Sequence, residues 1–597
     1  MIVVLPRSAG QVLPPLRPLG AARRQLCVGQ AQQARPRRPA VGPKPAGCCH
    51  FRLVRPGRRG NTEQHPGRRS AMTTPLPAPL SDHHPDGSEL SAATPVSARD
   101  RRADLMLLLA LGLVRLIVHL WLNGAYGFHR DELQVLDDAR HLDWGYVPYP
   151  PLVPWLARLE LAVFGTSLIG FRIVAVLAQC GAMVLAGLIA AELGGRRFAQ
   201  VCAALATACM PFGLVNSSIL MYCGPDLLWV VAAAWLVLRL AKGSDLRLWL
   251  ALGAVFGLGL MTRYTIVYWA IGLAAGVLAG PMRAQLRTRW PWLGVGVAFA
   301  VFLPNLIWQV RHNFVYLDFV AHIHARDVAI GRTDLFFPEQ LYANASALTL
   351  PIWLAGLGFL TLAGSMRRYR VLAWMYAVPL LLFALSRGRG YYMAPGYPML
   401  LAAGYVAIER WCASMPAGRA RGLRIAVAAL LAAGLPLGAS LHLPIAPINS
   451  PLWHFNRGLH GDYAEQVGWQ ELAQRVATVY RALPEAERAH TAILANNYGE
   501  AGAMALYGPA LGLPPVISRT NSAWYRGYGN PPPSVIIELG NTEEDQRGSV
   551  ARCTSHGVFR NREGVANEES ANGYAIFVCR DIPPIWPQIW GVKPRFG

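Results

Sequence analysis

Long apolar segments separated by short polar connections dominate the chain from about residue 105 to residue 443. A helix needs roughly 20 apolar residues to cross the hydrocarbon layer of a membrane, which is about 30 Å thick. By this measure the pattern predicts eleven transmembrane helices, some of them short. Their expected ranges are 105–123, 167–191, 199–216, 226–241, 249–261, 265–280, 292–310, 347–364, 371–386, 394–411 and 424–443.

The stretch 249–280 is too long to be one span. As a single helix it would extend about 48 Å, well beyond the bilayer. Basic clusters flank both of its ends, which indicates that both ends face the cytoplasm. We therefore expect a hairpin of two short helices, with its apex at residues 261–265 on the outer side.

Basic residues orient the predicted spans, because short cytoplasmic loops of membrane proteins are enriched in Lys and Arg. Such residues recur at alternate connections: Arg101-Arg102, Arg196-Arg197, Lys242 with Arg247, Arg283 to Arg289, Arg367 to Arg370 and Arg419 to Arg424. This places the N-terminus in the cytoplasm. An odd number of spans then places the C-terminus outside.

A region of different composition lies on each side of the apolar part. Residues 1–104 are rich in Pro, Arg, Ala and Gly and cannot bury enough apolar surface to offset chain entropy, so we predict a disordered arm. The composition changes at Met72, which suggests that translation begins there. Residues 444–597 instead alternate helical patterns with strand-like runs at 491–495, 534–539 and 575–579, which is typical of a small α/β domain.

Composition agrees with a multi-pass membrane protein whose membrane part is the region 105–443. The chain has 53% apolar and only 15% charged residues, too few charges for a soluble multidomain protein. Its net charge of +22 does not indicate a nucleic-acid partner, because residues 1–71 alone hold fourteen Arg or Lys and one Glu.

Two neighbouring carboxylates, Asp131 and Glu132, follow the first predicted span on its outer side. A carboxylate that is partly desolvated and near cations is a natural general base. The alternative is a solvated pair at the start of an interfacial helix, where acids suit the positive end of the helix dipole. Asp226, at the outer end of the fourth span, is the third candidate; after Pro225 it could equally begin a helix.

Three arginines lie on the predicted outer side, although basic residues of membrane proteins are enriched in cytoplasmic loops. They are Arg263 at the hairpin apex, and Arg387 and Arg389 in an outer connection. An ionisable group at membrane depth is a candidate functional residue. Arginine binds phosphate through two parallel hydrogen bonds, so these residues favour a phosphate-bearing lipid. Each could instead extend to lipid headgroups. The adjacent Tyr391 and Tyr392 could belong to the interfacial aromatic belt or contact a substrate.

One base and several phosphate-binding cations predict a reaction class. Glycoside hydrolysis uses two carboxylates, because the leaving oxygen needs an acid. A phosphate leaving group needs no acid, so the predicted reaction is single-displacement glycosyl transfer from a lipid phosphate, with inversion. A transporter of lipid-linked sugars is the alternative, although transporters usually show repeat symmetry and paired broken helices. A non-catalytic scaffold would leave the acid and the arginines unexplained.

Several motifs resemble those of bacterial family 39 glycosyltransferases, in the superfamily of dolichyl-phosphate-mannose protein mannosyltransferases and aminoarabinose lipid A transferases. They are Phe128-His129-Arg130-Asp131-Glu132-Leu133, Ala139 to Tyr146, Leu260 to Thr265, Gly388 to Tyr392 and Asn497 to Gly502. The resemblance implies a GT-C fold and a polyprenyl-phosphate sugar donor used on the outer face of the cytoplasmic membrane. The acceptor stays open among a lipid, a protein and an envelope glycan.

The resemblance also carries expectations for single residues. Asp131 matches the catalytic aspartate of the family and Glu132 its neighbour. The expected substrate-binding side chains are His129, Arg130, Arg263, Tyr264, Arg387, Arg389, Tyr391 and Tyr392. Two departures are Pro148-Tyr149, where relatives often have a polar or basic residue, and Arg263, where many have Lys. Metal use varies across the superfamily and no clear ligand set is present, so a divalent metal is left open and no other cofactor is expected.

The ten cysteines show no metal-ligand spacing. Cys553 and Cys579 both fall in the segment predicted to lie outside the cytoplasm, where oxidising conditions permit a disulfide. Two buried free thiols are the alternative.

Overall fold

The computed structural model describes residues 98–547 and 551–597. The predictions for residues 1–97, including the disordered arm and the start at Met72, lie outside these ranges. The first helix, α1 (Ala98–Leu122), begins before the predicted end of the arm. Residues 98–104 are therefore helical, and Asp104 in this turn pairs with Arg197 at 2.7 Å, which corrects the boundary of the arm.

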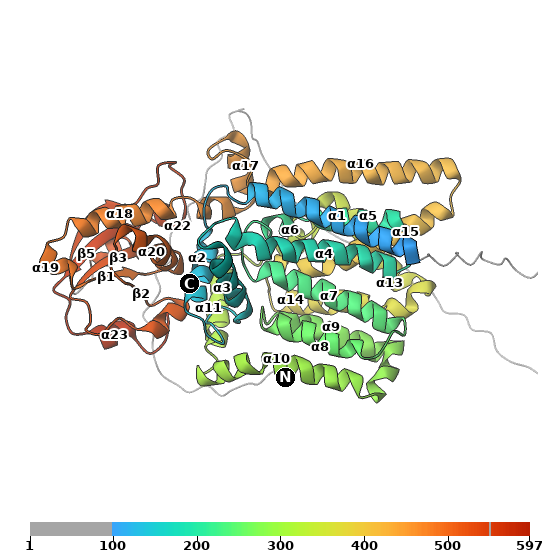
Figure 1. Cartoon of the computed structure of the whole chain (residues 1–597), viewed down its shortest axis with the longest axis horizontal. Helices are drawn as coiled ribbons and strands as arrows, with labels where there is room; N and C mark the ends of the chain where they lie inside the picture. The colour runs from blue at the N-terminus through green and yellow to red at the C-terminus, as the bar shows by residue number, and fades with distance from the viewer. Residues whose placement is uncertain (1–97, 548–550) are drawn as a thin grey trace, which may run out of the picture. The chain divides into compact units, whose positions relative to one another are not determined.

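The apolar region is a set of helices that lie side by side (Figure 1). All eleven predicted segments are largely helical. They correspond to α1, α4 (Ile173–Glu192), α5 (Arg197–Ala208) with α6 (Pro211–Val215), α7 (Cys223–Ala241), α8 (Leu248–Leu260), α9 (Ile266–Ala279), α10 (Trp290–Arg311), α13 (Leu350–Leu362), α14 (Val371–Leu385), α15 (Tyr397–Ala413) and α16 (Ala417–His442).

Fewer of these helices are long and apolar enough to cross a membrane alone. In the described ranges five qualify, and up to seven if each of two bent pairs is one span. The helices α8 and α14 have only 13 and 15 residues, about 20 Å of rise each. The chain is thus a mostly helical membrane protein.

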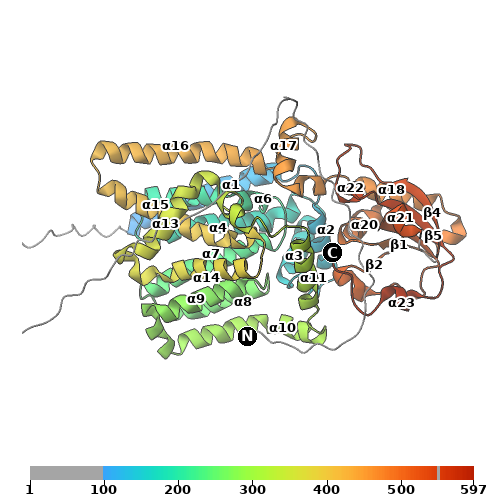
Figure 2. The ribbon, with the colours of Figure 1, turned by 180° about the vertical axis from the view of Figure 1, so that it is seen from behind.

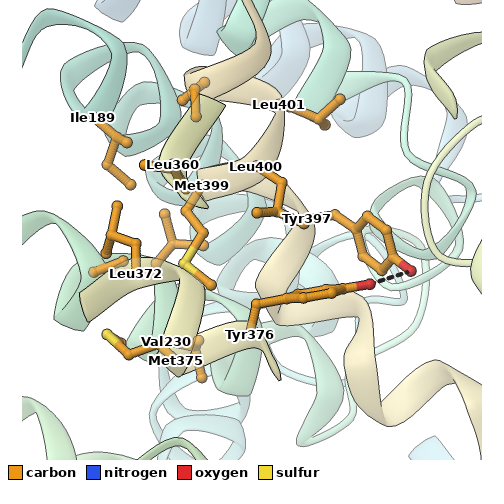
Figure 3. Packing of buried hydrophobic residues seen from close by; sticks show 14 of the residues in the cluster. Ile189, Val230, Leu360, Leu372, Met375, Tyr376, Tyr397, Met399, Leu400 and Leu401 are labelled. Carbon is orange, nitrogen blue, oxygen red and sulfur yellow. Dashed lines mark hydrogen bonds between the residues drawn. The ribbon is translucent and has the colours of Figure 1, made fainter. Parts of the chain in front are cut away.

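Close packing between the apolar helices uses glycine at one point and large side chains at another. A Cβ on Gly253 of α8 would lie 2.0 Å from the backbone oxygen of Gly294 on α10, so these two helices touch through their backbones. Figure 3 shows a second contact, where Val230, Met375 and Met399 pack together from α7, α14 and α15. The hydroxyls of Tyr376 and Tyr397 lie 3.3 Å apart at its edge.

The predicted break between α8 and α9 is present at residues 261–265. The backbone oxygen of Met261 accepts a hydrogen bond of 2.9 Å from the backbone N–H of Leu152. The break therefore contacts the polar segment after α1, which contains the short helices α2 (Arg130–Arg140) and α3 (Leu152–Phe164). A later connection forms α11 (Val315–Ala329) and α12 (Phe336–Tyr342).

The C-terminal part contains a five-stranded sheet of order β2-β1-β3-β5-β4. The first three strands in this order are parallel, and β5 runs antiparallel to both β3 and β4. The strands are β1 (Thr491–Ala495), β2 (Val516–Ser518), β3 (Val535–Asn541), β4 (Arg552–Val558) and β5 (Ala575–Arg580). The three predicted strands are β1, β3 and β5; β2 is too short and β4 too polar to be recognised from their patterns.

Helices accompany this sheet, and the two longest are α18 (Trp469–Arg481) and α20 (Tyr498–Leu511). The shorter ones are α17 (Pro451–Leu459), α19 (Glu485–Arg488), α21 (Glu543–Gln546), α22 (Glu568–Ala571) and α23 (Trp586–Trp590). In the structure Cys553 and Cys579 form a disulfide between β4 and β5.

The helix α20 packs directly on α2, and both ribbon views show the sheet beside this contact (Figure 1, Figure 2). A Cβ on Gly502 would lie 2.4 Å from the backbone oxygen of Leu133, so only glycine permits this approach. The contact places the C-terminal part against the segment that carries Asp131.

Candidate active site

The helix α2 begins with a capping box built from the Phe-His-Arg-Asp-Glu motif. The backbone N–H of Asp131 donates to Nδ1 of His129 at 3.1 Å, and Glu132 accepts from the backbone N–H of His129 at 2.9 Å. Asp131 and Glu132 therefore lie in the first turn, where the helix dipole favours acids. The role of His129 in this geometry is to cap the helix.

The two neighbouring carboxylates have different surroundings. Glu132 is fully buried and forms two hydrogen bonds with the guanidinium of Arg172, at 2.9 and 2.6 Å, and a third with the backbone N–H of Leu220 at 2.8 Å. The side chain of Asp131 is 30% exposed. Glu132 thus connects α2 to the start of α4, whereas Asp131 is accessible to a ligand.

Asp131 lines a cavity of about 940 Å³, which we name the donor cavity. Six of the eleven side chains predicted for the site line it: Asp131, Arg263, Tyr264, Arg387, Arg389 and Tyr392. The other five, His129, Arg130, Glu132, Asp226 and Tyr391, do not. The rest of the wall includes many apolar side chains, such as Val267, Leu317, Phe319 and Val320.

Arg263 is buried in a cage of aromatic rings. Its guanidinium carbon lies 4.9, 5.5 and 4.4 Å from the ring centres of Tyr222, Tyr391 and Tyr392, distances at which cation–π attraction operates. Asp226 faces it, with a shortest oxygen–nitrogen distance of 3.6 Å. Asp226 is buried and lines no part of the donor cavity, so its evident role is to balance the charge of Arg263.

The other two predicted arginines differ from each other. Arg389 is largely buried and donates from Nε to Asp327 at 2.6 Å and from Nη1 to the hydroxyl of Tyr391 at 3.2 Å. Arg387 is exposed and pairs with the exposed Asp334 at 3.1 Å. Arg389 is therefore fixed at the cavity wall, whereas Arg387 lies at its solvent-accessible rim.

Tyr498 contacts Asp131 from the C-terminal part, and sequence reasoning did not single it out. Its hydroxyl donates a hydrogen bond of 2.8 Å to Oδ1 of Asp131. Burial and the adjacent Asp131 raise the pKa of Tyr498, which keeps the hydroxyl protonated as a donor. The guanidinium of Arg130 stacks on this tyrosine, 4.5 Å from the ring centre. The Asn-Tyr-Gly-Glu motif was the available signal, but its partner is distant in sequence.

Tyr149 and Asp138 form a second pair that the sequence did not reveal. Tyr149 lines the donor cavity, and its hydroxyl donates to the buried carboxyl of Asp138 at 2.7 Å. Burial, together with the neighbouring Asp137, raises the pKa of Asp138 to about 7. Asp138 lies on α2 two turns after Asp131, so the same helix positions both carboxyl groups.

The side chains that could ligate a metal ion do not support a metal site. In the two described ranges the one group of at least three close ligand atoms is Glu538, Cys553 and Cys579. Both sulfurs belong to the disulfide, whereas a metal-binding cysteine is a thiolate. We derive no step through a metal.

Comparison with known proteins adds to this geometry. Residues 148–308 match the family described as dolichyl-phosphate-mannose-protein mannosyltransferase. Lipid A galacturonosyltransferase RgtD of Rhizobium johnstonii is 27% identical over 245 residues, which cover 40% of this chain and 50% of RgtD. The undecaprenyl phosphate-alpha-4-amino-4-deoxy-L-arabinose arabinosyl transferase 2 of Pseudomonas fluorescens is 27% identical over 428 residues, 66% of this chain and 71% of that protein.

Solved structures agree on the fold. ArnT from Cupriavidus metallidurans in the apo state superposes with a TM-score of 0.52 at 14% identity, covering 80% of this chain and 98% of ArnT. The structure of that ArnT bound to undecaprenyl phosphate gives the same TM-score over 81% of this chain and 99% of ArnT.

These matches show that the chain is similar to members of the superfamily of dolichyl-phosphate-mannose protein mannosyltransferases and aminoarabinose transferases, as its motifs indicated. The GT-C membrane fold expected from sequence is thereby confirmed at the level of the helical architecture. The range that matches the family begins after Asp131 and ends before Arg389. The chain spans about half the length of RgtD.

Proposed function

We propose that this protein is an inverting glycosyltransferase that moves a sugar from a polyprenyl-phosphate donor to an acceptor on the outer face of the cytoplasmic membrane. The observation that carries the proposal is one cavity lined by Asp131, Arg263 and Arg389 together. A base and two cations in one cavity match the needs of transfer from a phosphate leaving group.

Arg263 has unused capacity to bind an anion. A guanidinium has five N–H donors. Among the residues that the structure describes, the polar contacts of the Arg263 guanidinium are the Cys223 sulfur at 3.8 Å and Asp226 at 3.6 Å, both longer than a normal hydrogen bond to oxygen. A donor phosphate in the cavity would supply the missing acceptors.

The proposed reaction is a single displacement. An acceptor hydroxyl attacks the anomeric carbon of the donor sugar, and Asp131 takes the hydroxyl proton. The bond between the anomeric carbon and the phosphate oxygen breaks, and the phosphate leaves with the electron pair, stabilised by Arg263 and Arg389. Attack opposite to the leaving group inverts the anomeric configuration.

The apolar walls support a polyprenyl chain on the donor. Val267, Leu317 and Val320 line the donor cavity and are also exposed on the surface of the helical region. A long apolar chain could therefore extend from the cavity into the membrane. The names of the relatives support undecaprenyl phosphate as the carrier and lipid A as a candidate acceptor.

Topology and domain limits are part of the proposal. We assign residues 1–97 to an arm, 98–443 to the transmembrane catalytic domain with eleven spans, and 444–597 to an extracytoplasmic α/β domain. The N-terminus then lies in the cytoplasm. The disulfide supports an oxidising compartment for the last domain. A cysteine introduced at the exposed Arg562 should react with a membrane-impermeant maleimide added to intact spheroplasts. Labelling only after lysis would show that residues 444–597 lie in the cytoplasm.

The activity is tested with the purified full-length chain in proteoliposomes. Undecaprenyl-phosphate-linked aminoarabinose and hexuronic acid are supplied as donors, lipid A is supplied as the acceptor, and release of undecaprenyl phosphate is followed. Asp131→Asn should reduce release by about 10²–10⁴-fold, the usual contribution of a general base. Asp581→Asn, which removes an exposed carboxylate paired with Arg552, is the matched control. Equal release by Asp131→Asn and wild type would exclude Asp131 as the base, and donor flipping without release would favour a transporter.

A further inference from the structure

A second cavity, of about 530 Å³, shares Tyr498 in its wall with the donor cavity. We call it the polar cavity, because its wall includes Arg130, Arg326, Asn496, Asn497, Thr520 and Arg595. Its volume lies in the range of small-molecule sites, roughly 300–1,000 Å³. None of these residues takes part in the chemistry proposed above.

The polar cavity lies at the ends of two parallel strands. Asn496 and Asn497 follow β1, and Thr520 follows β2. In open α/β sheets, ligands bind outside the carboxyl ends of the parallel strands. Further wall comes from α11, which contributes Arg326 here and the adjacent Asp327 to the donor cavity. The helix α11 therefore contacts both cavities.

The charges in the polar cavity favour an anion. Arg130 pairs with Glu568, the acidic side chain of this wall. Within residues 98–547 and 551–597, the acidic partner of Arg326 is Asp327 at 3.4 Å, and Arg595 donates to a neutral partner, the side-chain oxygen of Asn496, at 3.2 Å. In this part of the chain both guanidinium groups thus keep unused N–H donors beside neutral amides, an arrangement that suits a phosphate or a carboxylate.

Tyr498 connects the polar cavity to the proposed chemistry. Its hydroxyl contacts Asp131, and its ring is covered by Arg130. A ligand in the polar cavity therefore lies one side chain away from the base. A ligand in the donor cavity contacts the same base from the side of Arg263 and Arg389.

We propose that the polar cavity binds the anionic part of the acceptor, a saccharide that carries a phosphate group. The inference rests on the proposed glycosyl transfer, in which the donor phosphate occupies the donor cavity. Arg326 and Arg595 hold the acceptor phosphate. The acceptor hydroxyl then reaches Asp131 past Tyr498.

Direct binding tests this without turnover. Radiolabelled lipid A with its phosphates, and the same lipid A after phosphatase treatment, are titrated against the full-length protein in nanodiscs. Arg326→Gln/Arg595→Gln should weaken binding of the phosphorylated form at least tenfold and leave the weaker binding of the dephosphorylated form unaltered. Arg481→Gln/Arg562→Gln, two exposed arginines of the same part of the chain, is the control and should bind as wild type does.

Three results would overturn the proposal: no preference of the wild type for the phosphorylated form, equal losses in test and control variants, or a loss for both forms of lipid A. The KM of the donor in the release assay is the second readout. If the double variant has a higher donor KM but binds lipid A as wild type does, the polar cavity belongs to the donor site. If wild type binds phosphorylated lipid A as expected but never cleaves a donor, the proposed function fails while the anion site remains.

Discussion

The hydroxyl of Tyr498 donates a hydrogen bond of 2.8 Å to the carboxylate of Asp131, across 367 positions of the chain. Asp131 lies in the first turn of α2, after the first apolar helix, and Tyr498 begins α20 after the first strand of the sheet. The C-terminal part therefore contributes a side chain that touches the proposed base.

Tyr498→Phe tests this relationship. A hydrogen bond to a carboxylate stabilises its charged form and contributes about 1.5–3 kcal/mol. Without it the carboxylate of Asp131 is no longer held in place, so we expect roughly tenfold lower kcat with little change in the donor KM. Tyr507→Phe, also on α20 but outside both cavities, is the control. An unchanged kcat, or a lower unfolding temperature that accounts for the whole loss, would contradict positioning of Asp131 by Tyr498.

Glu132→Gln should act on stability and not on the chemistry. It leaves the fully buried Arg172 without its charged partner, and breaking a buried pair costs about 3–5 kcal/mol. We expect a lower unfolding temperature and less folded protein, but an unchanged donor KM in the folded fraction. The exposed Glu485→Gln is the comparison. A large fall in kcat without a change in unfolding temperature would return Glu132 to the catalytic residues.

Arg263 is tested by three variants that separate charge balance from phosphate binding. Arg263→Gln should raise the donor KM at least tenfold and also destabilise the protein, because Asp226 becomes an uncompensated buried carboxylate. Adding Asp226→Asn should restore the unfolding temperature but not the KM. Arg263→Lys, which keeps the charge, should restore part of both. The exposed Arg311→Gln is the control. Recovery of the KM in the double variant would contradict phosphate binding by Arg263.

Asp138 predicts a pH dependence of stability. Its pKa is raised from about 4 to about 7, mainly by burial. Below pH 4 the carboxyl is protonated in both states. Between pH 4 and 7 the unfolded state ionises while the folded state keeps its proton, so this group removes about 1.4 kcal/mol of stability per pH unit as pH rises. Above pH 7 its contribution is constant.

The measurement compares unfolding of wild type and Asp138→Asn at several pH values. Relative to wild type, the variant should gain stability steadily from pH 4 to pH 7 and then level off. Asp581→Asn, at an exposed pair, should follow the wild type throughout. Parallel curves for Asp138→Asn and wild type would mean that Asp138 does not titrate in this window. The carboxyl of Asp138 is contacted or faced by Tyr149, Asp137 and Arg526. Substitutions of these residues should therefore change the stability of the protein over the same pH range.

The sequence by itself determined the helical membrane architecture, the break at residues 261–265 and three of the five strands. These follow from local patterns, because apolar runs, helix starts and alternating strands are encoded by neighbouring residues. The sequence also identified Asp131, Arg263 and Arg389 as candidate site residues, because a charged residue beside apolar segments is easily recognised in a sequence.

Only the tertiary structure decided which of the neighbouring carboxylates faces a cavity. Glu132 and Asp131 look alike in sequence, but Arg172 holds the first in the interior and leaves the second accessible. Likewise, Asp226 proves to face Arg263, and Tyr498 proves to contact Asp131. These pairings join residues far apart in the chain, so they depend on how helices and sheet pack, and no local pattern contains that information.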